Sequence, residues 1–267
     1  MTALLVTLGI VVAVVAAIRS TWSPCGVSML STVTPLAERS RGHRFGFTAA
    51  WFVLGATVGG ASLGLVAAGL AEGVHRVGPS WPVTLGVAAV AASITAASDI
   101  GPFGLNLPTH GRQVDELWLG RYRRWVYATG FGWQIGAGVA TYIMTAAVYL
   151  LVVLAALTGR PGVALALVTL FGLMRGLAVL GSWRITTPAA LHDFHRRFDA
   201  GGPASRQLAI VVQLGVAVIT GVVCGPVVGV TAVVGASVLL VLDLRPPSGA
   251  GHSPQAVATP RDSGVAG

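Results

Sequence analysis

The sequence has very little charge. Only 10% of its 267 residues are charged, against 54% that are hydrophobic, and none of its 17 basic residues is a lysine. A soluble globule of this size needs more charge to cover its surface, so we expect the lipid bilayer to be the solvent of this chain. The net charge of +8 does not indicate nucleic-acid binding, because the arginines lie between apolar runs and not along an amphipathic surface.

Cysteines and catalytic motifs are also scarce. Cys25 and Cys224 are the only cysteines and lie far apart, which excludes a small disulfide-stapled scaffold. The sequence has no phosphate-binding loop, dinucleotide fingerprint, zinc-protease motif or nucleophile elbow, and its acidic residues are scattered. We therefore expect no cofactor and no hydrolase; an enzyme with this sequence would be a membrane thiol-disulfide oxidoreductase.

Two histidines, His192 and His195, are three residues apart, but no cysteine or third histidine stands near them, so we expect no metal site. The segment from Thr187 to Phe198 is instead typical of an amphipathic helix at the membrane surface, with Phe194 and Phe198 toward lipid.

Long apolar runs dominate the sequence and predict an all-α integral membrane protein, a bundle of six or seven transmembrane helices. The last run, residues 207–242, would be about 54 Å long as one helix, too long for one crossing, and Cys224-Gly225-Pro226 is where we expect it to break. We expect residues 1–245 to form the membrane domain and the Gly- and Pro-rich tail 246–267 to be disordered. The predicted spans are Ala3–Ile18, Phe45–Leu70, Pro82–Ser98, Phe131–Leu157, Val163–Trp183, Gln207–Val223 and Val227–Leu242.

The arginines predict an orientation. Four follow the first span, four follow the third and four follow the fifth, whereas Arg76 and Arg160 stand alone in the intervening connections. By the positive-inside rule, the N-terminus lies outside a bacterial plasma membrane and the three long connections are cytoplasmic. Because no basic residue precedes the first apolar run and Arg19 follows it, we expect an uncleaved helix and not a signal peptide.

Glycine spacing raises the question of an internal repeat. Gly55, Gly59 and Gly64 recur at one offset as Gly172, Gly176 and Gly181, which would fit an inverted repeat of three plus three spans with broken helices. Close packing of helices through small residues explains the same spacing without a repeat. Both interpretations stay open at this point.

The segment Thr21-Trp22-Ser23-Pro24-Cys25-Gly26 carries the main chemical hypothesis. Ser23 as N-cap and Pro24 at the first helical position predict a helix start, with Cys25 in its first turn, where unpaired N–H groups stabilise a thiolate. The alternative is an inert, buried cysteine in a kinked helix. Cys224 stands at the other interruption, but the predicted topology places the two cysteines near opposite faces, and a disulfide needs Cα atoms within about 7 Å.

At Ser23-Pro24-Cys25 the chain resembles CcdA and the membrane domain of DsbD, a family of cytochrome c biogenesis and thiol-disulfide relay proteins. The resemblance covers about the first 70 residues and implies a membrane redox protein that takes electrons from a cytoplasmic thioredoxin-like partner through two cysteines. The chain departs from the family after the cysteine, where Gly26 replaces a proline, and in its second half, where residues 130–136 contain no cysteine. The two-cysteine relay carries over only if Cys224 takes the second place.

Arg175 lies within the fifth predicted span, where an unpaired charge would cost a few kcal/mol. We expect it to face the bundle interior, with Asp99, Gln134, Gln213 or a substrate anion as its partner, although a structural ion pair is the alternative. Two functions follow: a thiol-redox protein centred on Cys25, or a small-solute transporter whose midplane site combines Arg175 with the breaks at Pro24 and Pro226. A membrane scaffold or assembly factor is a third hypothesis.

Overall fold

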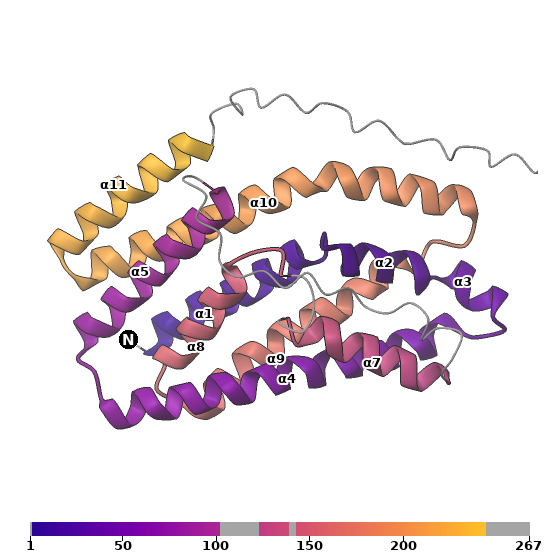
Figure 1. Cartoon of the computed structure of the whole chain (residues 1–267), viewed down its shortest axis with the longest axis horizontal. Coiled ribbons are helices and arrows are strands. Elements are labelled where there is room, and N and C mark those ends of the chain that lie inside the picture. Colours follow the sequence, from indigo (N-terminus) through magenta and orange to yellow (C-terminus); the bar gives the residue numbers. More distant parts are fainter. Residues whose placement is uncertain (1, 102–122, 139–142, 244–267) are drawn as a thin grey trace, which may run out of the picture.

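The computed structural model describes residues 2–101, 123–138 and 143–243, and within these ranges the chain is all helical (Figure 1), as predicted. Six helices are long and apolar enough to cross a membrane: α1, α4, α5, α9 with its short extension η2, α10 and α11. The predicted disordered tail, 246–267, lies outside the described ranges. The elements are α1 (Thr2–Ser20), α2 (Pro24–Thr32), α3 (Pro35–Ser40), α4 (Phe45–Val77), α5 (Trp81–Ile100), α7 (Arg124–Gly136), α8 (Ala147–Leu157), α9 (Pro161–Leu177), the 3₁₀ helix η2 (Ala178–Ser182), α10 (Pro188–Cys224) and α11 (Pro226–Asp243).

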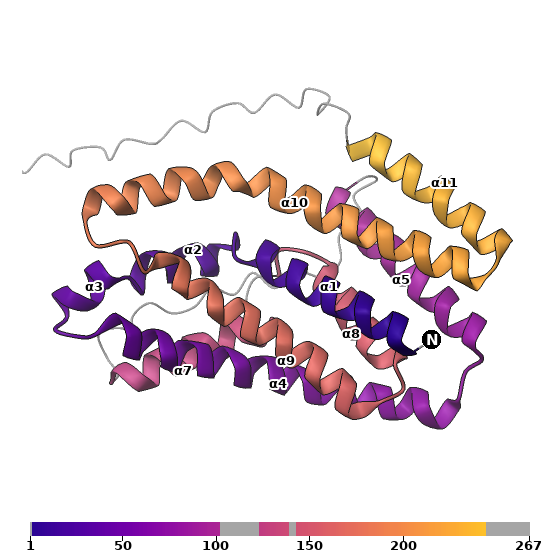
Figure 2. The same ribbon diagram turned by 180° about the vertical axis from the view of Figure 1, so that it is seen from behind.

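The helices run roughly along one direction, so that the bundle has two distinct ends (Figures 1 and 2). One end, which we call the arginine end, holds the starts of α4 and α7 and the connection from η2 to α10, with Arg44, Arg124 and Arg184. The opposite end holds the turns from α4 to α5, from α8 to α9 and from α10 to α11, with Arg76 and Arg160. The arginines therefore gather at one end of the bundle.

The predicted break in the last apolar run is confirmed. Helix α10 ends at Cys224 and α11 begins at Pro226, with Gly225 at a φ of 154° between them. Proline removes one backbone donor and glycine permits this positive φ, so the chain reverses there and α11 packs back against α10.

The prediction of one continuous span over Phe131–Leu157 is wrong, because α7 ends at Gly136 and α8 begins only at Ala147. Gly138 adopts a φ of 70°, a left-handed conformation that ends a helix and that glycine adopts without strain. Helix α7 lies toward the arginine end and α8 toward the opposite end (Figure 1). With 13 and 11 residues, each is shorter than the roughly 20 residues that one helix needs to cross a membrane.

Small residues bring α4 very close to two neighbours, α7 and α9. A Cβ added to Gly132 of α7 would lie 2.1 Å from the Phe52 carbonyl oxygen, and one added to Gly172 of α9 would lie 2.5 Å from the Ala56 carbonyl oxygen. In α4 itself, Gly55 and Gly59 face α7.

The same contacts bear on the glycine spacing. Gly55 of α4 meets the backbone of α7 at Thr129, whereas Gly172, its counterpart at the common offset, meets α4. If α4 and α9 were equivalent helices of an inverted repeat, Gly172 would face the helix equivalent to α7 and would not face α4. These glycines therefore serve close helix packing, and the inverted repeat stays a prediction.

Candidate functional site

Cys25 lies at the start of α2, as the sequence predicts. Ser23 is the N-cap in an extended conformation, and its side-chain oxygen accepts a hydrogen bond from the Gly26 amide at 3.2 Å. Pro24 occupies the first turn of α2 and is exposed, whereas Cys25 is buried, with 3% of its surface accessible. The helix start therefore directs the Cys25 thiol into the protein and leaves the proline on the surface.

The turn from α1 into α2 requires the glycine that follows Cys25. A Cβ on Gly26 would lie 2.1 Å from the Thr21 carbonyl oxygen, a distance at which the two atoms would clash. Because α1 ends at Ser20 and α2 begins at Pro24, only three residues connect the two helices at this point. Gly26 lets α2 begin directly against the last turn of α1.

Arg175 of α9 reaches this turn from another helix. Its side chain is buried, with 3% exposure; Nη1 donates to the Ile135 carbonyl oxygen at 2.7 Å and Nη2 donates to the Ser20 carbonyl oxygen at 3.3 Å. These two carbonyls belong to the last turns of α7 and α1, where the helix dipole is negative. The guanidinium therefore lies at the C-terminal ends of two helices.

Cys25 interacts electrostatically with the Arg175 guanidinium, and no aspartate or glutamate in the described part of the chain forms an ion pair with that arginine. The Phe171 ring also lies near this arginine, with the guanidinium carbon 5.7 Å from the ring centre. The structure thus brings Arg175 to the turn that precedes Cys25, although the sequence assigned these two residues to different hypotheses. Gln134 is half-buried and directly precedes Ile135, whose carbonyl binds Arg175.

The expected partners Asp99 and Gln213 contact each other and not Arg175. The Asp99 carboxylate accepts hydrogen bonds from the Gln213 side chain at 2.7 Å, from the Ala146 amide at 2.7 Å and from the Thr145 hydroxyl. Asp99 therefore caps the start of α8, where backbone N–H groups need acceptors.

Cys224 lies elsewhere. It ends α10 at the turn into α11, and its thiol donates to the Pro82 carbonyl oxygen at 3.3 Å. This turn lies at the opposite end of the bundle from α2 in both views (Figures 1 and 2), and neither cysteine forms a disulfide. The structure does not bring the two cysteines together, and the break at Pro226 contributes nothing to the surroundings of Arg175.

The first part of α10 packs against α2, contrary to the expectation that Phe194 and Phe198 face lipid. The Trp22 ring stacks on Phe198 with centroids 4.5 Å apart, and its Nε1 donates to the Phe198 carbonyl oxygen at 2.7 Å. Further along, Ser31 and His195 share a hydrogen bond of 2.8 Å. We call residues 188–202 the α10 arm. The arm covers the face of α2 on which Phe194 and Phe198 join the buried cluster of Met29, Leu30 and Val33.

Sequence reasoning missed a buried carboxylate, Glu38, at the arginine end. It is fully buried and accepts hydrogen bonds from the Thr48 hydroxyl, from the Tyr127 hydroxyl at 3.1 Å and from Arg41 at 3.3 Å. Burial and the neighbouring Glu38 carboxylate raise the pKa of Tyr127 to about 12. A local sequence pattern could not predict the contact with Tyr127, because Tyr127 is 89 residues away from Glu38 in sequence.

Among curated proteins, the chain is similar to the "Methylamine utilization protein MauF" of several bacteria. It is 31% identical to that of Paracoccus denitrificans over 172 residues, which is 62% of this chain and 60% of the relative. It is 28% identical to that of Methylophilus methylotrophus over 172 residues (64% and 60%), and 27% identical to that of Methylorubrum extorquens over 190 residues (70% and 66%).

The matched region thus spans 60% to 66% of the length of these relatives. No family model matches the chain, and no solved structure matches it. The chain is a polytopic membrane protein distantly related to MauF, and its helices imply contact with the lipid bilayer. The CcdA and DsbD family does not appear among these matches.

Proposed function

We propose that this chain is a membrane thiol-redox protein, similar in chemistry to the CcdA and DsbD family, with Cys25 as its reactive centre. The observation that carries the proposal is that the buried Arg175 guanidinium donates to the Ser20 carbonyl oxygen, at the turn that leads directly into the first turn of α2, where Cys25 lies. A buried cation without a carboxylate partner is complementary to an anion, and a thiolate is the anion that the neighbouring side chain can supply.

The chemistry is thiol-disulfide exchange. The Cys25 thiolate attacks a disulfide of a partner protein, forms a mixed disulfide and releases the partner's other sulfur as a thiolate. A dithiol of another protein then attacks the partner's sulfur in the mixed disulfide and releases the Cys25 thiolate. When that dithiol closes its own disulfide, the partner is left reduced and the dithiol is oxidised. This cycle needs only one cysteine from the chain, which fits the distance between Cys25 and Cys224.

The orientation and the partner follow from the same proposal. By the positive-inside rule the arginine end lies in the cytoplasm, so that α2 begins near that side and a cytoplasmic thioredoxin-like protein is the partner we propose. Because the relatives are named for methylamine utilization, we propose that the exchange serves the use of an amine as a nutrient.

A trapping experiment tests the thiol chemistry. The purified chain would be mixed with a thioredoxin whose resolving cysteine is replaced by serine and whose remaining cysteine carries an aromatic disulfide leaving group. We expect a mixed disulfide, visible on a non-reducing gel, in the unmodified chain and in the Cys224→Ser variant, and none in Cys25→Ser. Conjugation that persists in Cys25→Ser and disappears in Cys224→Ser would overturn the proposal.

Arg175 supplies the second arm of the test. Arg175→Lys keeps the charge but not the planar guanidinium with its several donors, whereas Arg175→Gln removes the charge. We expect the rate of conjugation to fall in both variants, and further in Arg175→Gln, because the thiolate loses its neighbouring cation. In a small-solute transporter, by contrast, Arg175→Gln would abolish uptake while Cys25→Ser left it unchanged.

A further inference from the structure

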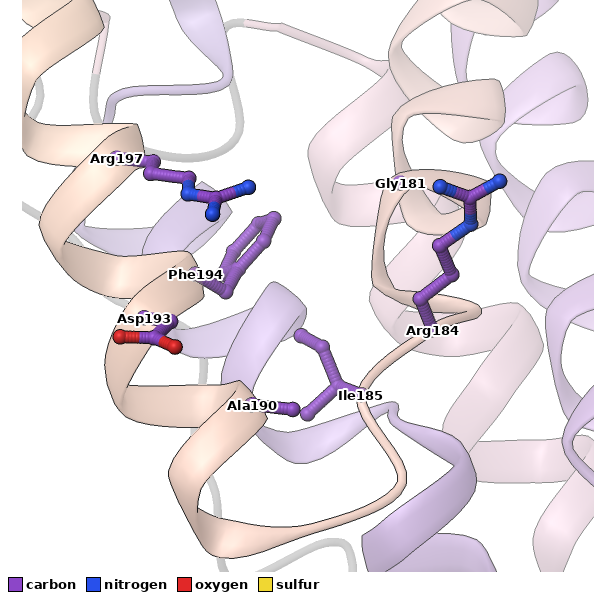
Figure 3. Close-up of a pocket in the computed structure, with 7 residues that line it drawn as sticks. All are labelled: Gly181, Arg184, Ile185, Ala190, Asp193, Phe194 and Arg197. Atoms are coloured by element: carbon purple, nitrogen blue, oxygen red, sulfur yellow. The ribbon is translucent and has the colours of Figure 1, made fainter.

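A pocket at the arginine end lies outside the Cys25 site. It has a volume of about 300 Å³ and lies between the end of η2 and the start of the α10 arm (Figure 3). Ile185 and Phe194 give it an apolar lining, with Gly181 at its edge. Figure 3 shows Arg197 on the α10 wall and Arg184 on the opposite wall, with Phe194 between them.

The two arginines are not neutralised within the described part of the chain. Neither Arg184 nor Arg197 forms an ion pair there, and Asp193, the acidic residue of the lining, pairs with Arg196 at 2.9 Å. Arg184 lies over the ring of Trp183, 4.8 Å from its centre, and this contact leaves its donors available. The pocket therefore presents two cations above an apolar lining.

The position of the pocket along the chain matches the depth of lipid phosphates. The apolar stretch of α9 and η2 that is long enough to cross the membrane ends at Ser182, and Arg184 follows two residues later. Between them Trp183 is 58% exposed, as expected for an aromatic side chain at the boundary between hydrocarbon and headgroups. Gly181 belongs to the crossing helix and Arg197 to the arm beyond it, so the pocket straddles this boundary.

We propose that this pocket binds the headgroup of an anionic phospholipid. The phosphate would lie between Arg184 and Arg197, where guanidinium groups donate to its oxygens in pairs, and the glycerol backbone would contact Phe194 and Ile185. A bound lipid would tie the end of η2 to the α10 arm, which form opposite walls of the pocket. A lipid is favoured over a protein partner, because the apolar helix that ends at Ser182 forms one wall of the pocket and places the pocket at the membrane boundary.

The test measures lipid retained by the purified full-length chain, using native mass spectrometry after exchange into detergent with phosphatidylglycerol or phosphatidylcholine. We expect preferential retention of phosphatidylglycerol. Arg184→Gln and Arg197→Gln should each lower its apparent affinity about fivefold and the double variant about thirtyfold, because each arginine near a membrane surface contributes a comparable factor. The Lys variants at both positions should retain most of the affinity.

Arg196→Gln is the matched control, since Arg196 is a neighbouring exposed arginine of the same helix that already pairs with Asp193. It should leave lipid retention unchanged. Equal loss in Arg196→Gln, or equal retention of phosphatidylcholine, would overturn the proposal. Displacement of the lipid by millimolar inorganic phosphate would also overturn it, because it would assign the site to a free anion.

Discussion

At the scale of single residues, Arg175 is the central feature of the protein. A buried guanidinium requires compensation, and here two backbone carbonyls at the C-terminal ends of α1 and α7 provide part of it. The end of α1 results from the break before Pro24, and the end of α7 results from the break after Gly136. The position of the Arg175 charge therefore depends on both breaks. Arg175 therefore joins three segments, α1, α7 and its own helix α9, close to the start of α2 that carries Cys25.

Gly26 offers a sharp test at this scale. Gly26→Ala places a methyl group against the Thr21 carbonyl oxygen at 2.1 Å, so the turn from α1 to α2 must open. We expect the free energy of unfolding to fall by about 1–3 kcal/mol, as for other overpacked positions, and trapping through Cys25 to weaken. Detergent-dependent unfolding followed by tryptophan fluorescence measures the first effect.

The control for Gly26→Ala is Gly86→Ala in the interior of α5, where an added Cβ meets nothing within 4 Å. Its stability should stay the same or rise slightly, because alanine is the better helix former. Equal losses in the two variants would show that the close approach at Thr21 is not what Gly26 serves.

At the scale of helices, the sequence predicted the interruptions at Pro24 and at Gly225-Pro226 and missed the one after Gly136. Gly225-Pro226 combines a missing donor with a flexible residue, and the apolar run around it was too long for one crossing, so the break at Cys224 was predictable. The break after Gly136 contains no proline, and its run has an ordinary length, so only the conformation of Gly138 reveals it. The start of α2 was predictable because Ser23 and Pro24 act locally. The hydrogen bond from Arg175 to the Ser20 carbonyl was not, because it joins residues 155 positions apart.

Helix packing against α4 supplies a second prediction. Gly172→Ala would place a methyl group 2.5 Å from the Ala56 carbonyl oxygen and so force α9 away from α4. We expect a loss of about 1–3 kcal/mol in unfolding free energy. Gly162→Ala, on the same helix but with nothing within 4 Å, should be neutral, and a comparable loss there would contradict the packing explanation.

The α10 arm gives a third prediction. Trp22→Ala removes both the stack on Phe198 and the hydrogen bond to its carbonyl, contacts that together contribute about 1–3 kcal/mol. Because the arm covers α2, we expect Cys25 to react with a maleimide roughly tenfold faster, measured by mass spectrometry. Trp183→Ala, which removes an exposed ring outside the arm, should leave the rate unchanged; an unchanged rate in Trp22→Ala would show that the arm does not limit access to Cys25.

At the scale of the whole molecule, the arginines at the ends of the described helices are divided unequally between the two ends of the bundle. The α4 to α5 and α8 to α9 turns carry one arginine each near them. The segment before α4, the start of α7, and the η2 to α10 connection taken together with the α10 arm carry two or three each. Arginines near short connections resist translocation, so the arginine end should stay in the cytoplasm. A cytoplasmic thiol partner could reach Cys25 only in this orientation, which makes topology a condition of the proposed function.

Reporter fusions decide the orientation. Alkaline phosphatase, which is active only outside the cytoplasm, should be active when fused after Gly78 or after Gly159, at the turns that follow α4 and α8. Green fluorescent protein, which fluoresces when it folds in the cytoplasm, should be fluorescent after Thr186, between η2 and α10. Exchanging the two reporters should silence both sets, which controls for expression. Phosphatase activity after Thr186 would place the arginine end outside. The cytoplasmic partner proposed for Cys25 would then have to be abandoned, while the helix packing around Arg175 would be unaffected.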